Sequence, residues 1–118
     1  MNLVKRFGEP NNNLEYTLSY NGEMVDLFFV YNNNTNNLVS VHAPPNYRYL
    51  VYPLYKLCSV IFMNQKLLAP CIPEAVIVSE YGEDWENPVK SWNYWKSSLN
   101  LGPVYTFNHS EIKQNIYY

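Results

Sequence analysis

The sequence has little charge and few histidines, and both shortages exclude classes of function. Only 15% of the 118 residues are charged, and the eight Lys and Arg residues are scattered, with a net charge of −2. Nucleic-acid-binding proteins usually carry a basic patch, so we expect no nucleic-acid partner. The two histidines, His42 and His109, lie far apart without the spacing of a zinc site. Each is expected to be an ordinary core or surface residue.

Long hydrophobic runs are also lacking. The longest apolar stretches, residues 27–31 and 50–55, are far too short to cross a bilayer, so no membrane segment is expected. The basic N-terminus is not followed by an apolar region, which argues against a secretory signal within the sequence. Apolar residues still make up 47% of the chain, enough for a core. The length fits one domain or part of one.

Residues 14–31 predict a β-hairpin. Apolar and polar residues alternate strictly over residues 14–20, and Asn21-Gly22 suits a two-residue type I′ turn before a second strand at 23–31. That turn fixes the register, placing Thr17 opposite Asp26. The preceding segment, 1–13, contains several turn-forming residues and predicts a connector.

Asp26 stands out because it interrupts a strand that is apolar on both faces. Burying an unpaired carboxylate costs several kcal/mol, so the side chain should be hydrogen-bonded, ion-paired or metal-bound. Two interpretations stay open. Asp26 is either a structural acceptor for Thr17, or a ligand of a divalent cation that needs a further carboxylate, for which Glu15 is a candidate.

A second hairpin is predicted at residues 56–71, after a polar Asn-rich loop at 32–37 whose composition suggests mobility. With a turn at Asn64-Gln65, Cys58 would lie directly opposite Cys71. The two cysteines would then form a cross-strand disulfide or, in a reducing compartment, pack as two small buried thiols.

The last part of the chain predicts a short helix and an aromatic tail. Pro73 and Gly82 suit the ends of a helix at 73–82, although the β-branched residues 76–78 favour a strand. Residues 83–118 are rich in aromatic residues without periodicity and predict an irregular tail whose rings cover a sheet edge. The alternative is that these rings stack on a sugar or base. Together these elements predict an α+β fold made mostly of antiparallel hairpins.

Several motifs, in this order, resemble the fukutin/LicD family of glycan phosphotransferases. The resemblance covers residues 4–97, nearly the whole chain, and matches the C-terminal portion of the family's catalytic domain. The motifs are Arg6-Phe7-Gly8-Glu9-Pro10, Leu14-Glu15, Val25-Asp26-Leu27-Phe28-Phe29-Val30-Tyr31, Tyr52-Pro53-Leu54, Leu57-Cys58, Pro70-Cys71, Tyr81-Gly82-Glu83-Asp84-Trp85 and Pro88-Val89-Lys90-Ser91-Trp92.

The resemblance implies a nucleotidyltransferase-like fold and a metal-dependent transfer reaction. The family moves ribitol phosphate, or a similar phospho-alditol or phosphocholine group, from a CDP-activated donor to a protein-linked glycan. In fukutin-type enzymes this occurs during protein O-mannosyl glycosylation in the Golgi or ER lumen. Mg²⁺ or Mn²⁺ is the implied cofactor, and Asp26 matches an acidic position on a later core strand. The resemblance therefore makes Asp26 the candidate catalytic residue and metal ligand.

The chain departs from the family in lacking an Asp-x-Asp pair, which carries the principal metal ligands. Three interpretations follow. The chain is a partial transferase domain that is inactive alone, or a non-catalytic accessory module of the secretory pathway that associates with a full-length transferase. The third, an unrelated secreted structural domain, requires the ordered motifs to be coincidental.

Overall fold

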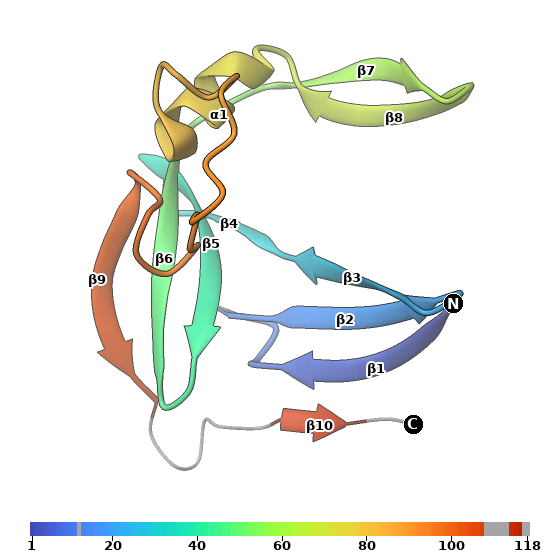
Figure 1. The fold of residues 1–118 in the computed structure, drawn as a ribbon, viewed down its shortest axis with the longest axis vertical. Helices are drawn as coiled ribbons and strands as arrows, with labels where there is room; N and C mark the ends of the chain where they lie inside the picture. Colours follow the sequence, from blue (N-terminus) through green and yellow to red (C-terminus); the bar gives the residue numbers. More distant parts are fainter. Residues whose placement is uncertain (12, 108–113, 117–118) are drawn as a thin grey trace.

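Strands dominate the computed structural model, which describes residues 1–11, 13–107 and 114–116 (Figure 1). The described secondary structure comprises two four-stranded antiparallel sheets, a two-stranded hairpin and a short helix. The chain is therefore of the α+β class with strands predominating, as the sequence predicts. In the described part of the chain, no helix is long and apolar enough to cross a membrane.

The first sheet has the strand order β10-β1-β2-β3. Its strands are β1 (Asn2–Phe7), β2 (Glu15–Tyr20), β3 (Glu23–Phe28) and β10 (Gln114–Ile116). Pairing of β1 with β10 brings the first and the last described strands of the chain side by side (Figure 1). β3 forms one edge of this sheet, and all six of its residues are exposed.

The hairpin of β2 and β3 has the register that its turn predicts. Thr17 lies opposite Asp26, and Glu15 lies opposite Phe28. Both turn residues, Asn21 and Gly22, have positive φ angles of 50° and 82°, as a type I′ turn requires.

The prediction of a connector at residues 1–13 is wrong for its first half, where β1 forms. Two basic residues weaken the apolar signal of this strand, and its stability comes from pairing with β2 and β10 on either side. The turn residues connect β1 to β2 tightly. Gly8 has φ +80°, and a Cβ there would lie 2.0 Å from the carbonyl oxygen of Asn13, so only glycine fits.

The second sheet has the order β4-β5-β6-β9, and its strands run across those of the first sheet (Figure 1). They are β4 (Val30–Asn32), β5 (Asn36–Ala43), β6 (Asn46–Pro53) and β9 (Leu101–Thr106). The strand predicted at 23–31 is thus interrupted at Phe29, where the chain passes from one sheet to the other.

The bounds of two predicted segments are corrected by the strands. The Asn-rich loop predicted at 32–37 is shorter, because β4 ends at Asn32 and β5 begins at Asn36, and the Asn33 side chain accepts hydrogen bonds in the turn from the backbone N–H groups of Thr35 (3.0 Å) and Asn36 (2.7 Å). The aromatic tail is irregular from residue 83 to 100, but Leu101–Thr106 pair with β6 as β9. That pairing joins segments about fifty residues apart, which a local pattern does not reveal.

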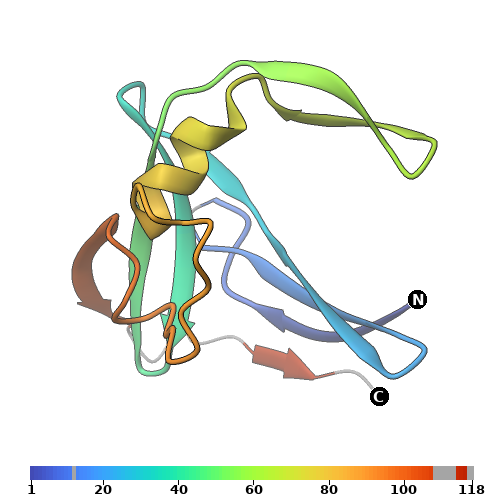
Figure 2. The ribbon, with the colours of Figure 1, turned by 45° about the horizontal axis from the view of Figure 1, so that its top comes forward.

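The second predicted hairpin forms from β7 (Leu57–Phe62) and β8 (Gln65–Pro70), and it extends away from both large sheets (Figures 1 and 2). Its turn is Met63-Asn64, both with positive φ, instead of Asn64-Gln65. The predicted register is therefore wrong, and Cys58 lies opposite Ala69. Cys58 is nevertheless disulfide-bonded to Cys71 along the diagonal, with the two Cα atoms 4.9 Å apart.

The helix α1 (Pro73–Tyr81) follows the disulfide and packs against β6. Gly82 ends it with a φ of +86°, and its N–H donates to the carbonyl oxygen of Val78. α1 thereby places its last residues beside the second sheet (Figure 2).

The core is small and lies between the two large sheets. Its buried apolar residues are Phe7, Leu14, Val41, Leu50 and Phe107. Many large apolar side chains remain exposed, above all on the edge strand β3 and on the β7–β8 hairpin. An exposed apolar surface of this kind is typical of a site of protein association.

Candidate functional site

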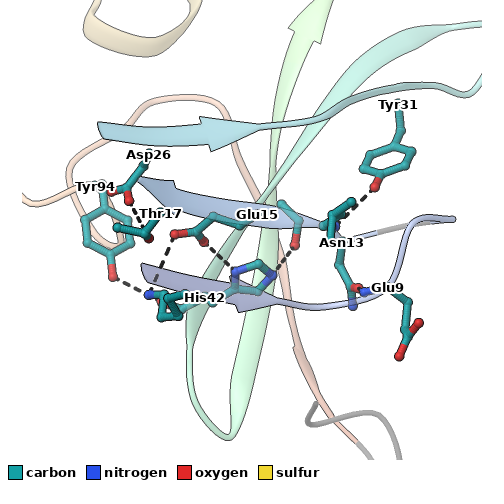
Figure 3. A network of polar contacts seen from close by, with 11 residues as sticks. Glu9, Asn13, Glu15, Thr17, Asp26, Tyr31, His42 and Tyr94 are labelled. Carbon is teal, nitrogen blue, oxygen red and sulfur yellow. Dashed lines mark hydrogen bonds and ion pairs between the residues drawn. The ribbon is translucent and has the colours of Figure 1, made fainter. Parts of the chain in front are cut away.

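A buried polar contact joins the two large sheets. His42 on β5 lies 2.8 Å through Nδ1 from Glu15 Oε2 on β2, and 3.1 Å through Nε2 from Ser40 Oγ (Figure 3). The His42 side chain is 4% exposed and packs against the rings of Phe7 and Phe107, at centroid distances of 4.2 and 5.7 Å. His42 is therefore a hydrogen-bonded core residue, whereas His109 lies outside the described residues.

The order Ser40, His42, Glu15 is also the order of a nucleophile, a base and an acid in a hydrolase triad. Here Ser40 is only 2% exposed, so its hydroxyl is closed to a substrate. The three residues act as a structural link between the sheets.

A cavity of about 610 Å³ lies beside this link, between the first sheet, the second sheet and the end of α1. Its walls are largely apolar, as is usual for a pocket that binds a small molecule. Polar groups come from every side: Lys5, Glu15, Asp26, Tyr52, Glu80 and Tyr94. Tyr94 belongs to the aromatic tail, and its hydroxyl donates to the carbonyl oxygen of His42 at 3.1 Å.

Asp26 lines this cavity from the edge strand β3. Its Oδ1 accepts a hydrogen bond of 2.7 Å from the hydroxyl of Thr17 (Figure 3). The expectation that this carboxylate is buried is wrong, because among the described strands β3 has a neighbour on one side only, and Asp26 is exposed. No large desolvation cost therefore requires a partner, and the carboxylate combines a structural contact with access to the cavity.

In the same cavity, the hydroxyl of Tyr52 on β6 donates to Glu80 Oε2 on α1 at 2.5 Å. Burial raises the pKa of Tyr52 well above its ordinary value, and the hydrogen bond to Glu80 and its charge raise it further. The phenol thus stays protonated and remains a neutral donor in the cavity.

Three curated proteins match the chain over 107 residues. They are the ribitol-5-phosphate transferases FKTN of Macaca fascicularis and Homo sapiens, at 31% identity each, and of Mus musculus, at 32%. This chain is similar to fukutin. The match covers 86% of the chain, so the resemblance found in the motifs is confirmed, but the chain spans only 23% of the length of the fukutin sequences.

No family model and no solved structure matches the chain. The similarity to fukutin is therefore one of sequence alone, and the nucleotidyltransferase-like fold stays a prediction.

The side chains in the cavity do not fit a complete cation site of the kind that the resemblance implies. Glu15 binds His42 through Oε2 and lies 3.9 Å from the Lys5 ammonium through Oε1. Asp26 brings one carboxylate, already hydrogen-bonded to Thr17. Within residues 1–11, 13–107 and 114–116, no three His, Cys, Asp or Glu side chains gather as metal ligands do.

Sequence reasoning identified Asp26 and Glu15 but missed Lys5, Tyr52, Glu80 and Tyr94. The structure brings all six to one cavity. Tyr52 and Glu80 are 28 residues apart and meet only because α1 packs on β6. Two signals fell on the missed cavity positions: the fukutin-like motif Tyr52-Pro53-Leu54, and the aromatic composition of the tail that contains Tyr94.

The link between the sheets predicts a stability effect. Glu15→Ala leaves the buried His42 without its acceptor and is expected to lower the free energy of unfolding by about 1 to 3 kcal/mol, as measured by urea denaturation. Glu15→Gln keeps a side-chain oxygen and should lose less. Glu23→Ala, an exposed acid on β3, is the control. A loss for Glu15→Ala no larger than for this control would show that the pair does not hold the sheets.

The raised pKa of Tyr52 predicts a response to alkaline pH. An unfolded tyrosine ionises near pH 10, whereas Tyr52 in the folded chain stays protonated to higher pH. Above about pH 10 the folded state therefore binds more protons than the unfolded state, and the free energy of unfolding falls as the pH rises. Tyr52→Phe removes this ionisable group, so the free energy of unfolding of the variant should fall less steeply between about pH 9 and 11 than that of the wild type.

Urea denaturation at closely spaced pH values measures the slope. Tyr20→Phe, at an exposed tyrosine, is the control. If Tyr52→Phe and the wild type lose stability with the same slope, Tyr52 does not contribute in this way.

Proposed function

We propose that this chain takes part in the transfer of ribitol phosphate, or of a similar phospho-alditol or phosphocholine group, from a CDP-activated donor to a protein-linked glycan. The observation that carries this proposal is the similarity to ribitol-5-phosphate transferases over 86% of the chain. The proposed setting is protein O-glycosylation in the Golgi or ER lumen.

The chemistry of the cavity supports a polyol as its ligand. Asp26 and Glu80 offer carboxylate oxygens, and Tyr52 and Tyr94 offer hydroxyls, around an apolar wall. Carboxylates accept hydrogen bonds from hydroxyl groups but repel phosphate. The alditol or glycan hydroxyls therefore suit the carboxylates of Asp26 and Glu80 better than the phosphate groups do.

In the proposed reaction, a glycan hydroxyl oxygen forms a bond to the donor phosphorus, and the bond from that phosphorus to CMP breaks. The hydroxyl proton must pass to a base. Asp26 is the candidate in this chain, because its exposed carboxylate faces the cavity. Bound Mg²⁺ or Mn²⁺ would neutralise charge on the donor diphosphate.

Asp26 would supply at most one ligand of such a cation, and the other ligands would come from outside the described residues. The missing Asp-x-Asp pair agrees with this arrangement. We therefore expect the chain to bind donor or acceptor groups without catalysing transfer alone.

The proposal is tested by titrating CDP-ribitol into the purified chain in the presence of Mg²⁺ or Mn²⁺, with isothermal titration calorimetry. Asp26→Asn keeps an oxygen for the Thr17 hydroxyl but removes the charge, and it is expected to weaken binding about tenfold. Glu23→Gln removes a charge from the same strand away from the cavity and should leave the affinity unchanged. A folded chain that does not bind CDP-ribitol, or binds it equally well after Asp26→Asn, would contradict the proposal.

A second candidate function is that of a non-catalytic accessory module that associates with a full-length fukutin-type transferase. The exposed apolar residues of β3 and the β7–β8 hairpin favour it. These residues would contact the part of the transferase that lies outside the matched segment, because that segment is only 23% of the fukutin length. Apolar strands left uncovered in this chain would then be buried in the complex.

Association is measured by size-exclusion chromatography with light scattering after mixing the chain with a full-length fukutin-type transferase. Ile61→Glu places a charge on the exposed β7, at a side chain that is 72% exposed, and should abolish the complex without unfolding the chain. Ser91→Glu adds a charge at an exposed tail position and is the control. Failure of the wild-type chain to form a complex, or an unchanged complex after Ile61→Glu, would exclude this role.

A further inference from the structure

A second pocket, of about 390 Å³, lies where the chain leaves α1, and it shares no lining residue with the large cavity. Two turns build it after Gly82 reverses the chain. The N–H of Asn87 donates to the carbonyl oxygen of Asp84 at 3.0 Å, and the N–H of Trp92 donates to that of Val89 at 3.2 Å. These turns bring residues 84–92 back towards Tyr81 at the end of the helix.

The aromatic residues of the tail divide into two groups. Tyr94 and Trp95 cover the second sheet, since Tyr94 bonds to His42 and the Trp95 ring lies under the Arg48 guanidinium at 5.5 Å. Tyr81, Trp85 and Trp92 instead line the pocket. Tyr81 and Trp85 are 45% and 38% exposed, so these two side chains are not buried against a sheet.

The Tyr81 and Trp92 rings contact one another, with centroids 4.8 Å apart and planes tilted by 37°. No ligand fits between two rings at this distance and tilt, so the rings pack on one another and each leaves only its outer surface open to the pocket. A cage for a quaternary ammonium ion needs separated rings around the cation. A packed pair of rings suits a ligand that lies against their open surface with one apolar face.

Hydrogen-bonding groups line the same pocket as these rings. The side-chain amide of Asn87 donates to the Asp84 carboxylate, which orients both groups. Each retains further capacity, because a carboxylate accepts several hydrogen bonds and an amide both donates and accepts. The segment 83–90 has a net negative charge, because it contains three acidic residues and one basic residue: Glu83, Asp84, Glu86 and Lys90. Binding of a phosphate or another anion is therefore disfavoured.

We propose that this pocket binds one pyranose ring of a neutral glycan. The C–H groups on one face of a pyranose carry a small positive charge and suit the negative faces of the Tyr81 and Trp92 rings. Hydroxyl groups at the edge of the sugar both donate and accept, which matches Asp84 and Asn87. The volume is at the small end of ligand pockets, as a single sugar ring requires. This site does not depend on phosphate transfer and would hold a glycan outside the cavity of Asp26.

The test uses methyl α-mannopyranoside, methyl β-glucopyranoside and methyl β-galactopyranoside as probes, with saturation-transfer difference NMR and tryptophan fluorescence. We expect at least one of them to bind, with saturation strongest at the C–H protons of one sugar face. Trp92→Ala should weaken binding at least about tenfold, and Trp92→Phe, which keeps a ring, should weaken it less. Asn87→Ala changes an exposed side chain and should weaken binding in a chain that remains folded.

Glu23→Gln is the matched control, because it alters an exposed side chain that lines neither the large cavity nor the second pocket and should leave sugar binding unchanged. Titrating CDP-ribitol into Trp92→Ala and Asn87→Ala separates this inference from the proposed transferase role. Three outcomes would overturn it: no binding of any methyl pyranoside to the folded chain, binding unaffected by Trp92→Ala and Asn87→Ala, or loss of sugar binding in Glu23→Gln. Tighter binding of tetramethylammonium chloride or inorganic phosphate than of every sugar would overturn it as well.

Discussion

The buried contact between Glu15 and His42 is the interaction on which the rest of the structure depends. The two large sheets are formed by strands that run across one another, and their shared apolar core is small. A buried histidine that loses its acceptor carries the full cost of an unsatisfied polar group, so the contact strongly favours the packed arrangement. Phe7 and Phe107 close around the imidazole and exclude water from it. The same packing creates the cavity, because its lining residues from both sheets and α1 come together only while the sheets stay together.

The chain has two pockets with hydrogen-bonding groups, and their chemistry differs. The cavity beside His42 has carboxylates and phenols around an apolar wall, with Tyr52 kept protonated by burial and by Glu80. The pocket beyond α1 has packed aromatic rings and one carboxylate–amide pair. Under the functions proposed above, the second pocket would hold a sugar apart from the reacting group, and binding there would help to position the acceptor.

Apolar surface is exposed at two places in the chain. Among the described strands β3 pairs on one side only, and the β7–β8 hairpin is fixed by a disulfide and by contact with α1 but buries little of its own surface. A disulfide limits the unfolded conformations of such a hairpin without requiring a core beneath it. The hairpin can therefore present apolar side chains on an ordered scaffold.

The amino-acid sequence alone determined the features that depend on neighbouring residues. Asn21-Gly22 set the register of the first hairpin because its turn type needs two positive φ angles, and Pro73 and Gly82 marked the helix. The ordered motifs likewise pointed to fukutin. The register predicted for the second hairpin was wrong by two positions, since Cys58 pairs with Ala69 and not with Cys71. The sequence is compatible with a turn at Asn64-Gln65 or at Met63-Asn64, and the folded chain has the second.

Tertiary structure decided that β1 and β9 form as strands, each with partners of its own, and which residues make up the site. Both strands gain their stability from partners that local patterns do not identify, and β9 pairs with a strand about fifty residues away. Asp26 was recognised from its sequence context, but its exposure followed from the position of β3 at a sheet edge. Glu15 met His42, and Tyr52 met Glu80, through the packing of whole sheets and a helix. Sequence periodicity specifies which side of an element a residue occupies, whereas long-range packing specifies which other element that side will face.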